Sequence, residues 1–287
     1  MHRRDCFRTL IAGAALGLPR VSLARTDKSC FRAAICAYSF REQFKKGSMT
    51  YADLIRMAAD AGADGIDMTA YWLKDTSDET LFALKRLAYR SSVAIYTIGI
   101  GASMARPTPE LREAEVQTVR KWLDVAERLG AAHMRVFGGD VPKGASEDQA
   151  VAWAVETLKH CAEEAAKKGI TLGVEDDGGI TTNADRTVEI VKKADSPWAG
   201  INLDIGNFPN DGYAQIEMCA PYATNVHFKT HVHIDHKPEP VDFAHVLKIL
   251  GHTGYRGYLA IEYEAKDNPV TAVPAMVAKL RAAIQAA

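Results

Sequence analysis

The sequence predicts a single (β/α)8 (TIM) barrel of the α/β class. Short runs rich in Val, Ile and Tyr alternate eight times with longer amphipathic runs, as buried parallel strands and their connecting helices do. No linker divides the 263 residues after position 24, a length that suits one barrel or two small domains. The GxGxxG fingerprint of a doubly wound open sheet, the main competing fold, is absent.

Each strand and helix is expected from its periodicity and its flanking residues. The expected strands cover residues 32–40, 65–71, 93–101, 133–138, 170–175, 199–205, 223–230 and 257–263. The expected helices cover residues 50–61, 78–91, 109–129, 147–168, 183–194, 213–221, 241–251 and 270–285. The helix at 213–221 is short, which indicates an unusual connection there.

Local signals support the predicted helix boundaries. Side chains that accept a hydrogen bond from the first helical turn precede five of the helices: Thr50, Ser77, Thr108, Ser146 and Asn183. Glycines follow four of them, where a left-handed or tight turn favours this residue: Gly62, Gly130, Gly169 and Gly254.

Residues 1–24 have the pattern of an export signal peptide, which leaves 25–287 as the barrel. A basic start with Arg3 and Arg4 precedes a short apolar run, and a small-x-small cleavage signal ends at Ala24. The arginine pair resembles a twin-arginine signal, although Phe7 lies one place later than usual. We therefore expect a periplasmic protein exported by the twin-arginine route. The alternatives are an ordinary secretory leader and an uncleaved tail.

The net charge and the cysteine spacing argue against a nucleic-acid-binding protein and against a cysteine zinc site. The chain has 35 Lys and Arg and 36 Asp and Glu, and residues 1–24 hold four of the basic and one of the acidic residues, so the remainder has a formal charge of −4. A mildly acidic domain is a poor binder of nucleic acid. No later apolar run is long enough for a membrane span, and a homo-oligomer is allowed. Cys30, Cys36, Cys161 and Cys219 permit disulfides in an oxidising compartment but form no CxxC zinc motif.

Four residues at the ends of the last four predicted strands suggest a metal site. They are Glu175, Asp204, His227 and Glu262, separated by 29, 23 and 35 residues, about one strand–helix unit each. Successive strands of one barrel would bring them to the same mouth. Carboxylates and an imidazole are suitable ligands for one divalent ion such as Mn²⁺, Mg²⁺, Co²⁺ or Zn²⁺.

The segment VHFKTHVHIDH (226–236) has the highest density of potentially catalytic or metal-binding side chains in the chain. His227, Lys229, His231 and His233 share one face while the segment stays extended. His227 is the best ligand candidate because it lies within the strand, whereas His231 and His233 are expected in a loop over the mouth, near substrate. Lys229 would be a cationic partner for an oxyanion. Alternating histidines can also be a surface feature.

Four further residues are candidates for substrate binding. Arg135 lies in the fourth strand and needs an anionic partner; it contacts substrate oxygens or pairs with Asp67 or Glu175. Asn207 follows Asp204 and orients it or contacts substrate. Asp67 and Tyr38, in the second and first strands, are weaker candidates of the same kind.

The ordered segments AGADGIDM, MRVFGG, VEDDGG, LDIGNF, VHFKTH and IEYE resemble the xylose-isomerase-like TIM barrel superfamily, in particular its sugar phosphate isomerase/epimerase family. The resemblance implies that Glu175, Asp204, His227 and Glu262 bind one divalent ion. Two departures concern substrate handling. The family often has Glu-x-His after strand five, where this chain has Glu175-Asp176-Asp177, and a glutamate at the end of strand two, where this chain has Asp67.

The predicted function is a divalent-metal-dependent isomerase or epimerase of a small-molecule carbohydrate, a sugar or keto-sugar. Glu175, Glu262 and Lys229 are the predicted catalytic residues, and the reaction is proton abstraction next to a carbonyl through a metal-bound enediolate. No Lys/Arg cluster for a phosphate is evident, which favours an unphosphorylated substrate.

Three alternatives compete with this prediction. A lyase or dehydratase on keto-sugars or 3-keto-glycosides would share the first step and the same site. A non-catalytic periplasmic sugar-binding protein would need no buried metal site. An endonuclease IV-type repair enzyme would need more strand-end histidines and a basic face, and the charge of −4 argues against it.

Overall fold

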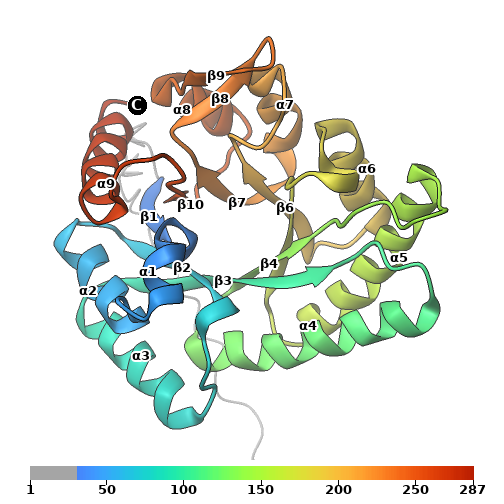
Figure 1. Ribbon diagram of the computed structural model, residues 1–287, viewed down its shortest axis with the longest axis horizontal. Coiled ribbons are helices and arrows are strands. Elements are labelled where there is room, and N and C mark those ends of the chain that lie inside the picture. Colours follow the sequence, from blue (N-terminus) through green and yellow to red (C-terminus); the bar gives the residue numbers. More distant parts are fainter. Residues whose placement is uncertain (1–30) are drawn as a thin grey trace, which may run out of the picture.

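Eight parallel strands close into one barrel in the computed structural model, which describes residues 31–287. The predicted export peptide (1–24) and Cys30 lie outside the described residues. Neighbouring strands follow the order β1-β10-β7-β6-β5-β4-β3-β2, and Figure 1 shows the helices on the outside of this ring. The barrel strands are β1 (Arg32–Cys36), β2 (Gly65–Thr69), β3 (Ala94–Ser103), β4 (His133–Phe137), β5 (Thr171–Glu175), β6 (Ala199–Asp204), β7 (Ala223–Phe228) and β10 (Tyr258–Ile261). The predicted single (β/α)8 barrel is confirmed.

The eight predicted helices are present, most of them within two residues of the expected limits. The helices are α1 (Arg41–Lys46), α2 (Tyr51–Asp60), α3 (Asp78–Arg90), α4 (Pro109–Leu129), α5 (Glu147–Ala166), α6 (Ala184–Ala194), α7 (Gly212–Cys219), α8 (Phe243–His252) and α9 (Pro269–Ala286). The five predicted capping side chains each accept a backbone N–H of the first turn. No helix of residues 31–287 is both long and apolar enough to cross a membrane.

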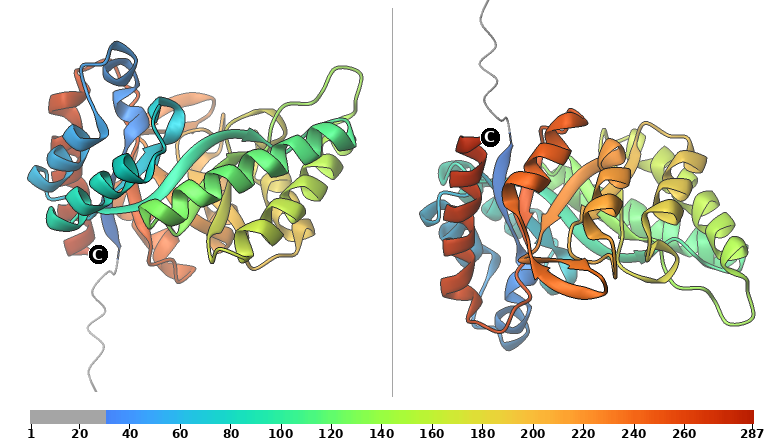
Figure 2. Two further views of the ribbon diagram at one scale, coloured as in Figure 1. Left: turned by 90° about the horizontal axis from the view of Figure 1, so that it is seen from below. Right: turned by 90° about the horizontal axis from the view of Figure 1, so that it is seen from above.

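Two segments differ from the prediction. The first strand ends at Cys36 rather than at residue 40, and a 3-10 turn (Ala37–Phe40) leads into the unpredicted helix α1. The expected loop after β7 is instead a hairpin of β8 (His231–Ile234) and β9 (Lys237–Pro240). Asp235 and His236 have φ angles of 50° and 59°, which a tight two-residue hairpin turn requires. The hairpin lies at the end of the barrel where β1 ends, so it borders the mouth (Figure 2, right).

Polar side chains occupy part of the barrel interior. Tyr96 on β3 donates from its hydroxyl to Asn225 Oδ1 on β7 at 3.1 Å, and Asn225 Nδ2 donates to Asp67 Oδ2 on β2 at 3.2 Å. Since β7 neighbours neither β2 nor β3, these bonds cross the barrel. Tyr96, Asn225 and Asp67 therefore satisfy one another by hydrogen bonds, which a low-dielectric interior favours.

Gly99 makes room for the buried guanidinium group of Arg135. A Cβ added to Gly99 on β3 would lie 2.8 Å from Nη2 of Arg135 on the neighbouring strand β4. The missing side chain lets the guanidinium lie across β3 and point toward the mouth. This glycine thus contributes to the position of a site residue rather than to a turn.

Candidate metal centre

The four predicted ligands converge at the mouth of the barrel. Glu175 and Asp204 are the last residues of β5 and β6, His227 lies in β7, and Glu262 directly follows β10. One candidate ligand atom from each lies within 4.8 Å of the others, and all four residues are buried. The carboxyl ends of parallel strands meet at one face of a closed barrel, so the spacing in the sequence translates into proximity in space.

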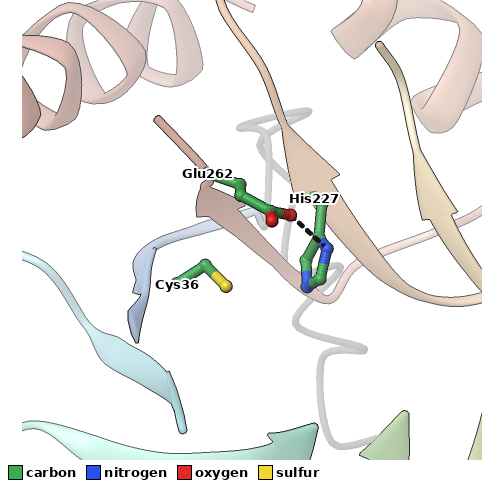
Figure 3. Close-up of side chains that lie close together, drawn as sticks. All are labelled: Cys36, His227 and Glu262. Atoms are coloured by element: carbon green, nitrogen blue, oxygen red, sulfur yellow. Dashed lines mark ion pairs between the residues drawn. The ribbon is translucent and has the colours of Figure 1, made fainter. Parts of the chain in front are cut away.

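The four residues are arranged around Nδ1 of His227. This nitrogen is 2.7 Å from Oε1 of Glu175, 2.7 Å from Oε2 of Glu262 and 3.9 Å from Oδ2 of Asp204. Figure 3 shows the carboxylate of Glu262 and the imidazole of His227 pointing toward each other. A single proton on Nδ1 can serve only one carboxylate, so the cluster contains more acceptor oxygens than donors.

The orphaned oxygens fit a divalent cation. Oδ2 of Asp204 and Oε2 of Glu262 are buried and accept no hydrogen bond of good geometry among residues 31–287. Their charged neighbours are Nζ of Lys229, 3.2 Å from Oδ2, and Nδ1 of His227, 2.7 Å from Oε2. Buried carboxylate oxygens in this state are costly unless a cation binds them. Three carboxylates and one imidazole suit Mn²⁺, Mg²⁺, Co²⁺ or Zn²⁺, and these residues would hold one such ion.

The pKa values of two of these residues are shifted by burial and by the neighbouring charges. Burial raises the pKa of Asp204 to about 7, although the nearby ammonium of Lys229 opposes this shift. Burial alone would lower the pKa of His227, but the negative charge of Glu262 outweighs it and holds that pKa well above its usual value. Both effects come from carboxylates crowded together in a region without water.

Asp67 lies behind His227 and does not line the cavity. Its Oδ2 is 2.8 Å from Nε2 of His227, and both side chains are about 2% exposed. Asn225 donates to the same carboxylate oxygen. A carboxylate that accepts the second ring N–H of a metal-binding histidine fixes its tautomer and orientation. The structure therefore places this predicted substrate residue against the imidazole, where it leaves Nδ1 free to act as a ligand.

Cys36 is a neighbour of the cluster that the sequence analysis missed. Its Sγ forms a second group with His227 and Glu262, drawn in Figure 3. Burial, followed by the charges of Glu262 and Asp67, raises the pKa of this thiol to about 12. A protonated thiol is a poor ligand, so the group of three carboxylates and His227 is the better site. Cys36, Cys161 and Cys219 are free and buried.

A cavity of about 140 Å³ opens beside the cluster, with room for several water molecules or a small ligand. Its lining contains the predicted substrate residues Tyr38, Arg135 and Asn207, but not His231 and His233, which lie on the hairpin. The full lining is Tyr38, Tyr71, Arg135, Phe137, Glu175, Asp177, Asn207, Lys229, Glu262 and Glu264. Tyr71, Phe137, Asp177 and Glu264 were not predicted. Each lies at or just after a strand end, and that position was the only signal available.

Arg135 is held in the cavity wall by several contacts. Its Nε is 3.1 Å from Oε2 of Glu175, and Nη1 donates to the Tyr71 hydroxyl at 2.9 Å and to the Ile100 carbonyl at 2.8 Å. The guanidinium carbon lies 4.1 Å from the ring centre of Phe137, within cation–π distance. Pairing with Glu175, one of the two predicted alternatives, is confirmed, and the side chain also lines the cavity.

Lys229 is the second buried cation of the wall. Its Nζ is 3.2 Å from Oδ2 of Asp204 and 3.9 Å from Oε1 of Glu262, and it also forms an ion pair with Glu264. The ammonium thus links the ligand cluster to the rim of the cavity.

Comparison with known proteins agrees with the barrel fold. A family model described as xylose isomerase-like TIM barrel matches residues 55–283. No curated protein matches the chain. Among solved structures, a D-psicose 3-epimerase from Clostridium cellulolyticum H10 is 17% identical, with a TM-score of 0.70 over 88% of this chain and 96% of that chain.

Two further solved structures are similar to a comparable degree. A 3-keto-D-glucoside 4-epimerase from E. coli is 15% identical, with a TM-score of 0.69 over 89% of this chain and 100% of that chain. A probable 3-DHS dehydratase from Bacillus anthracis is 16% identical, with a TM-score of 0.67 over 87% and 98% of the two chains. At these identities the likeness establishes the shared barrel fold.

The two candidate ligand groups can be separated by mutation. With Mn²⁺ at 100 times its Kd, we expect about 2.7 kcal/mol of added stability, which raises the Tm by about 5–10 °C. Asp204→Asn should abolish this rise because it removes a buried ligand charge. Cys36→Ser should retain the rise. Thermal unfolding with and without Mn²⁺ measures both, and loss of the rise in Cys36→Ser alone would contradict the assignment.

Asp67→Asn tests the contact behind His227. The amide cannot accept the ring N–H as strongly, and we expect Mn²⁺ affinity to fall about 10- to 100-fold. Titration calorimetry on the dialysed protein measures the affinity directly. Asp64, a partly exposed acid directly before the same strand, provides the matched control: Asp64→Asn should bind Mn²⁺ like the wild type. Equal affinity in Asp67→Asn would exclude a positioning role.

Proposed function

We propose that this chain, which belongs to the xylose isomerase-like TIM barrel family, is a divalent-metal-dependent isomerase or epimerase of an uncharged sugar or keto-sugar. The observation that carries the proposal is the convergence of three buried carboxylates, from Glu175, Asp204 and Glu262, on Nδ1 of His227. It adjoins a small cavity at the face of the barrel where active sites of this fold lie.

A bound divalent ion would supply a Lewis acid that polarises a carbonyl oxygen and makes the neighbouring C–H bond more acidic. The residues of this chain would supply the proton transfer. Glu262 lines the cavity. Its Oε2 faces Nδ1 of His227, which leaves its other carboxylate oxygen to accept a proton from a substrate carbon. The ammonium of Lys229, 3.9 Å from Glu262, would stabilise negative charge that develops nearby.

The two glutamates of the site differ in their surroundings. Glu175 is hydrogen-bonded through Oε1 to Asn202 Nδ2 at 3.2 Å, and its Oε2 pairs with Arg135. Glu262 has different partners: its Oε2 lies 2.7 Å from Nδ1 of His227, and its Oε1 lies 3.9 Å from Nζ of Lys229. We assign proton abstraction to Glu262 and assign Glu175 the role of a ligand whose conjugate acid can return the proton. Return to the opposite face gives epimerisation, and return to the neighbouring carbon gives isomerisation.

A lyase or dehydratase activity is the second candidate. The observation in its favour is the difference between the two glutamates, of which only Glu175 pairs with Arg135. An elimination needs one base and no second carboxylate on the opposite face of the substrate. The fold shared with a probable 3-DHS dehydratase is compatible with it. The two candidates share the first step and differ only in the fate of the carbanion.

The experiment that tests the function is deuterium exchange. The protein with Mn²⁺ is incubated with a panel of keto-sugars and 3-keto-glycosides in D₂O and followed by proton NMR. We expect deuterium at one carbon next to the carbonyl. A new sugar signal then indicates an epimerase or isomerase, and a new olefinic signal indicates a lyase.

Glu262→Gln should lower the exchange rate by about 10²–10⁴-fold, the usual contribution of a general base. The metal content of the variant, measured in parallel, separates lost chemistry from lost metal. Glu239→Gln on the exposed strand β9 is the control and should exchange normally. If the wild type with Mn²⁺ exchanges no proton on any compound, a non-catalytic sugar-binding protein becomes the better description.

We also propose export through residues 1–24, on the sequence grounds given above. Expression of the full chain in a bacterium with a twin-arginine pathway should yield a periplasmic protein whose N-terminus is near residue 25. Arg3→Lys with Arg4→Lys should retain the precursor in the cytoplasm. Unchanged processing of this double variant would indicate the ordinary secretory route, and an intact N-terminus at Met1 would indicate no export.

A further inference from the structure

The cavity wall carries more negative than positive charge. Four of its lining residues are carboxylates and two are cations. Both cations are already paired within the wall, Arg135 with Glu175 and Lys229 with Asp204 and Glu264. An entering anion would find no free cation among the lining residues.

A bound metal ion does not reverse this balance. The five carboxylates at the site are Glu175, Asp177, Asp204, Glu262 and Glu264. Against them stand the single charges of Arg135 and Lys229 and the two charges of a divalent ion, which leaves a formal excess of one negative charge. A narrow cavity with low-dielectric walls strengthens the effect of such an excess on a charged ligand.

Glu264 has a special position among these carboxylates. Its side chain is 33% exposed, whereas those of Lys229, Glu175 and Glu262 are at most 7% exposed. It lies at the rim and pairs with the ammonium that a phosphate or carboxylate would otherwise reach. It is two residues beyond Glu262, on the loop between β10 and α9, and is not one of the four candidate ligands.

We propose that Glu264 is a specificity-determining residue that excludes phosphorylated and carboxylated sugars by occupying Lys229. This inference rests on the proposed sugar isomerase or epimerase function and names the substrate class of that site as uncharged. Like charges placed against a ligand are an established way to reject a wrong partner. The pair also keeps Lys229 directed across the cavity, where it can donate to a hydroxyl or carbonyl oxygen of a neutral ligand.

The test measures anion binding rather than turnover. The Mn²⁺-loaded full chain is titrated with D-fructose 6-phosphate by calorimetry. We expect the wild type to bind it weakly or not at all. Glu264→Gln should bind it at least tenfold more tightly, because the amide leaves the Lys229 ammonium available to the phosphate. Glu264→Ala is a second variant with the same expectation, and Glu239→Gln on the exposed hairpin should behave like the wild type.

Two results would overturn the proposal: tight binding of the sugar phosphate by the wild type, or no gain of binding in either Glu264 variant. The Mn²⁺-dependent rise in Tm, measured on each variant, shows whether the metal centre is intact. Failure of the proposed function would appear differently, as the absence of deuterium exchange in every keto-sugar. That result is independent of the anion affinities, so the two failures are distinguishable.

Discussion

The crowding of three buried carboxylates around one imidazole nitrogen is the interaction on which the rest of the site depends. Glu175, Glu262 and Asp204 all direct oxygens toward Nδ1 of His227, and these charges would repel one another strongly away from water. The nearby cations are arranged to offset them: Arg135 on one side and Lys229 on the other. The remaining deficit of positive charge, marked by oxygens without donors, is the physical reason for proposing a divalent ion there.

The closed barrel is what makes this arrangement stable. Asp67 comes from β2 and His227 from β7, strands on different parts of the ring, and only closure brings the carboxylate to the imidazole. Asn225 donates to that carboxylate and also to Asn202 Oδ1 at 2.7 Å, and Asn202 in turn donates to Glu175. The hydrogen bonds therefore connect both sides of the ligand cluster below the mouth. Such a connected network limits the rotamers of each ligand.

The sequence predicted the parts of the molecule that depend on local periodicity. The strand and helix limits follow from apolar patterning and capping residues such as Thr108, and the four ligands follow from their places at strand ends. It did not predict the hairpin, because residues 237–240 read KPEP, and two prolines and two charged residues oppose a strand assignment. It also could not assign Asp67 to the imidazole or Cys36 to the cluster. Both positions depend on which strands face each other across the ring, which the order of the sequence does not contain.

The ion pairs of Lys229 affect both the proposed chemistry and the proposed substrate selectivity. Catalysis requires a carboxylate that can accept a proton, and Lys229 lies closer to Asp204 and Glu264 than to the proposed base Glu262. The same ion pairs leave no unpaired cation in the cavity wall for an anionic substrate. A substitution that released Lys229 to bind a phosphate would also change the field at Glu262. Acceptance of charged sugars and the basicity of the proposed base are therefore coupled through this single ammonium group.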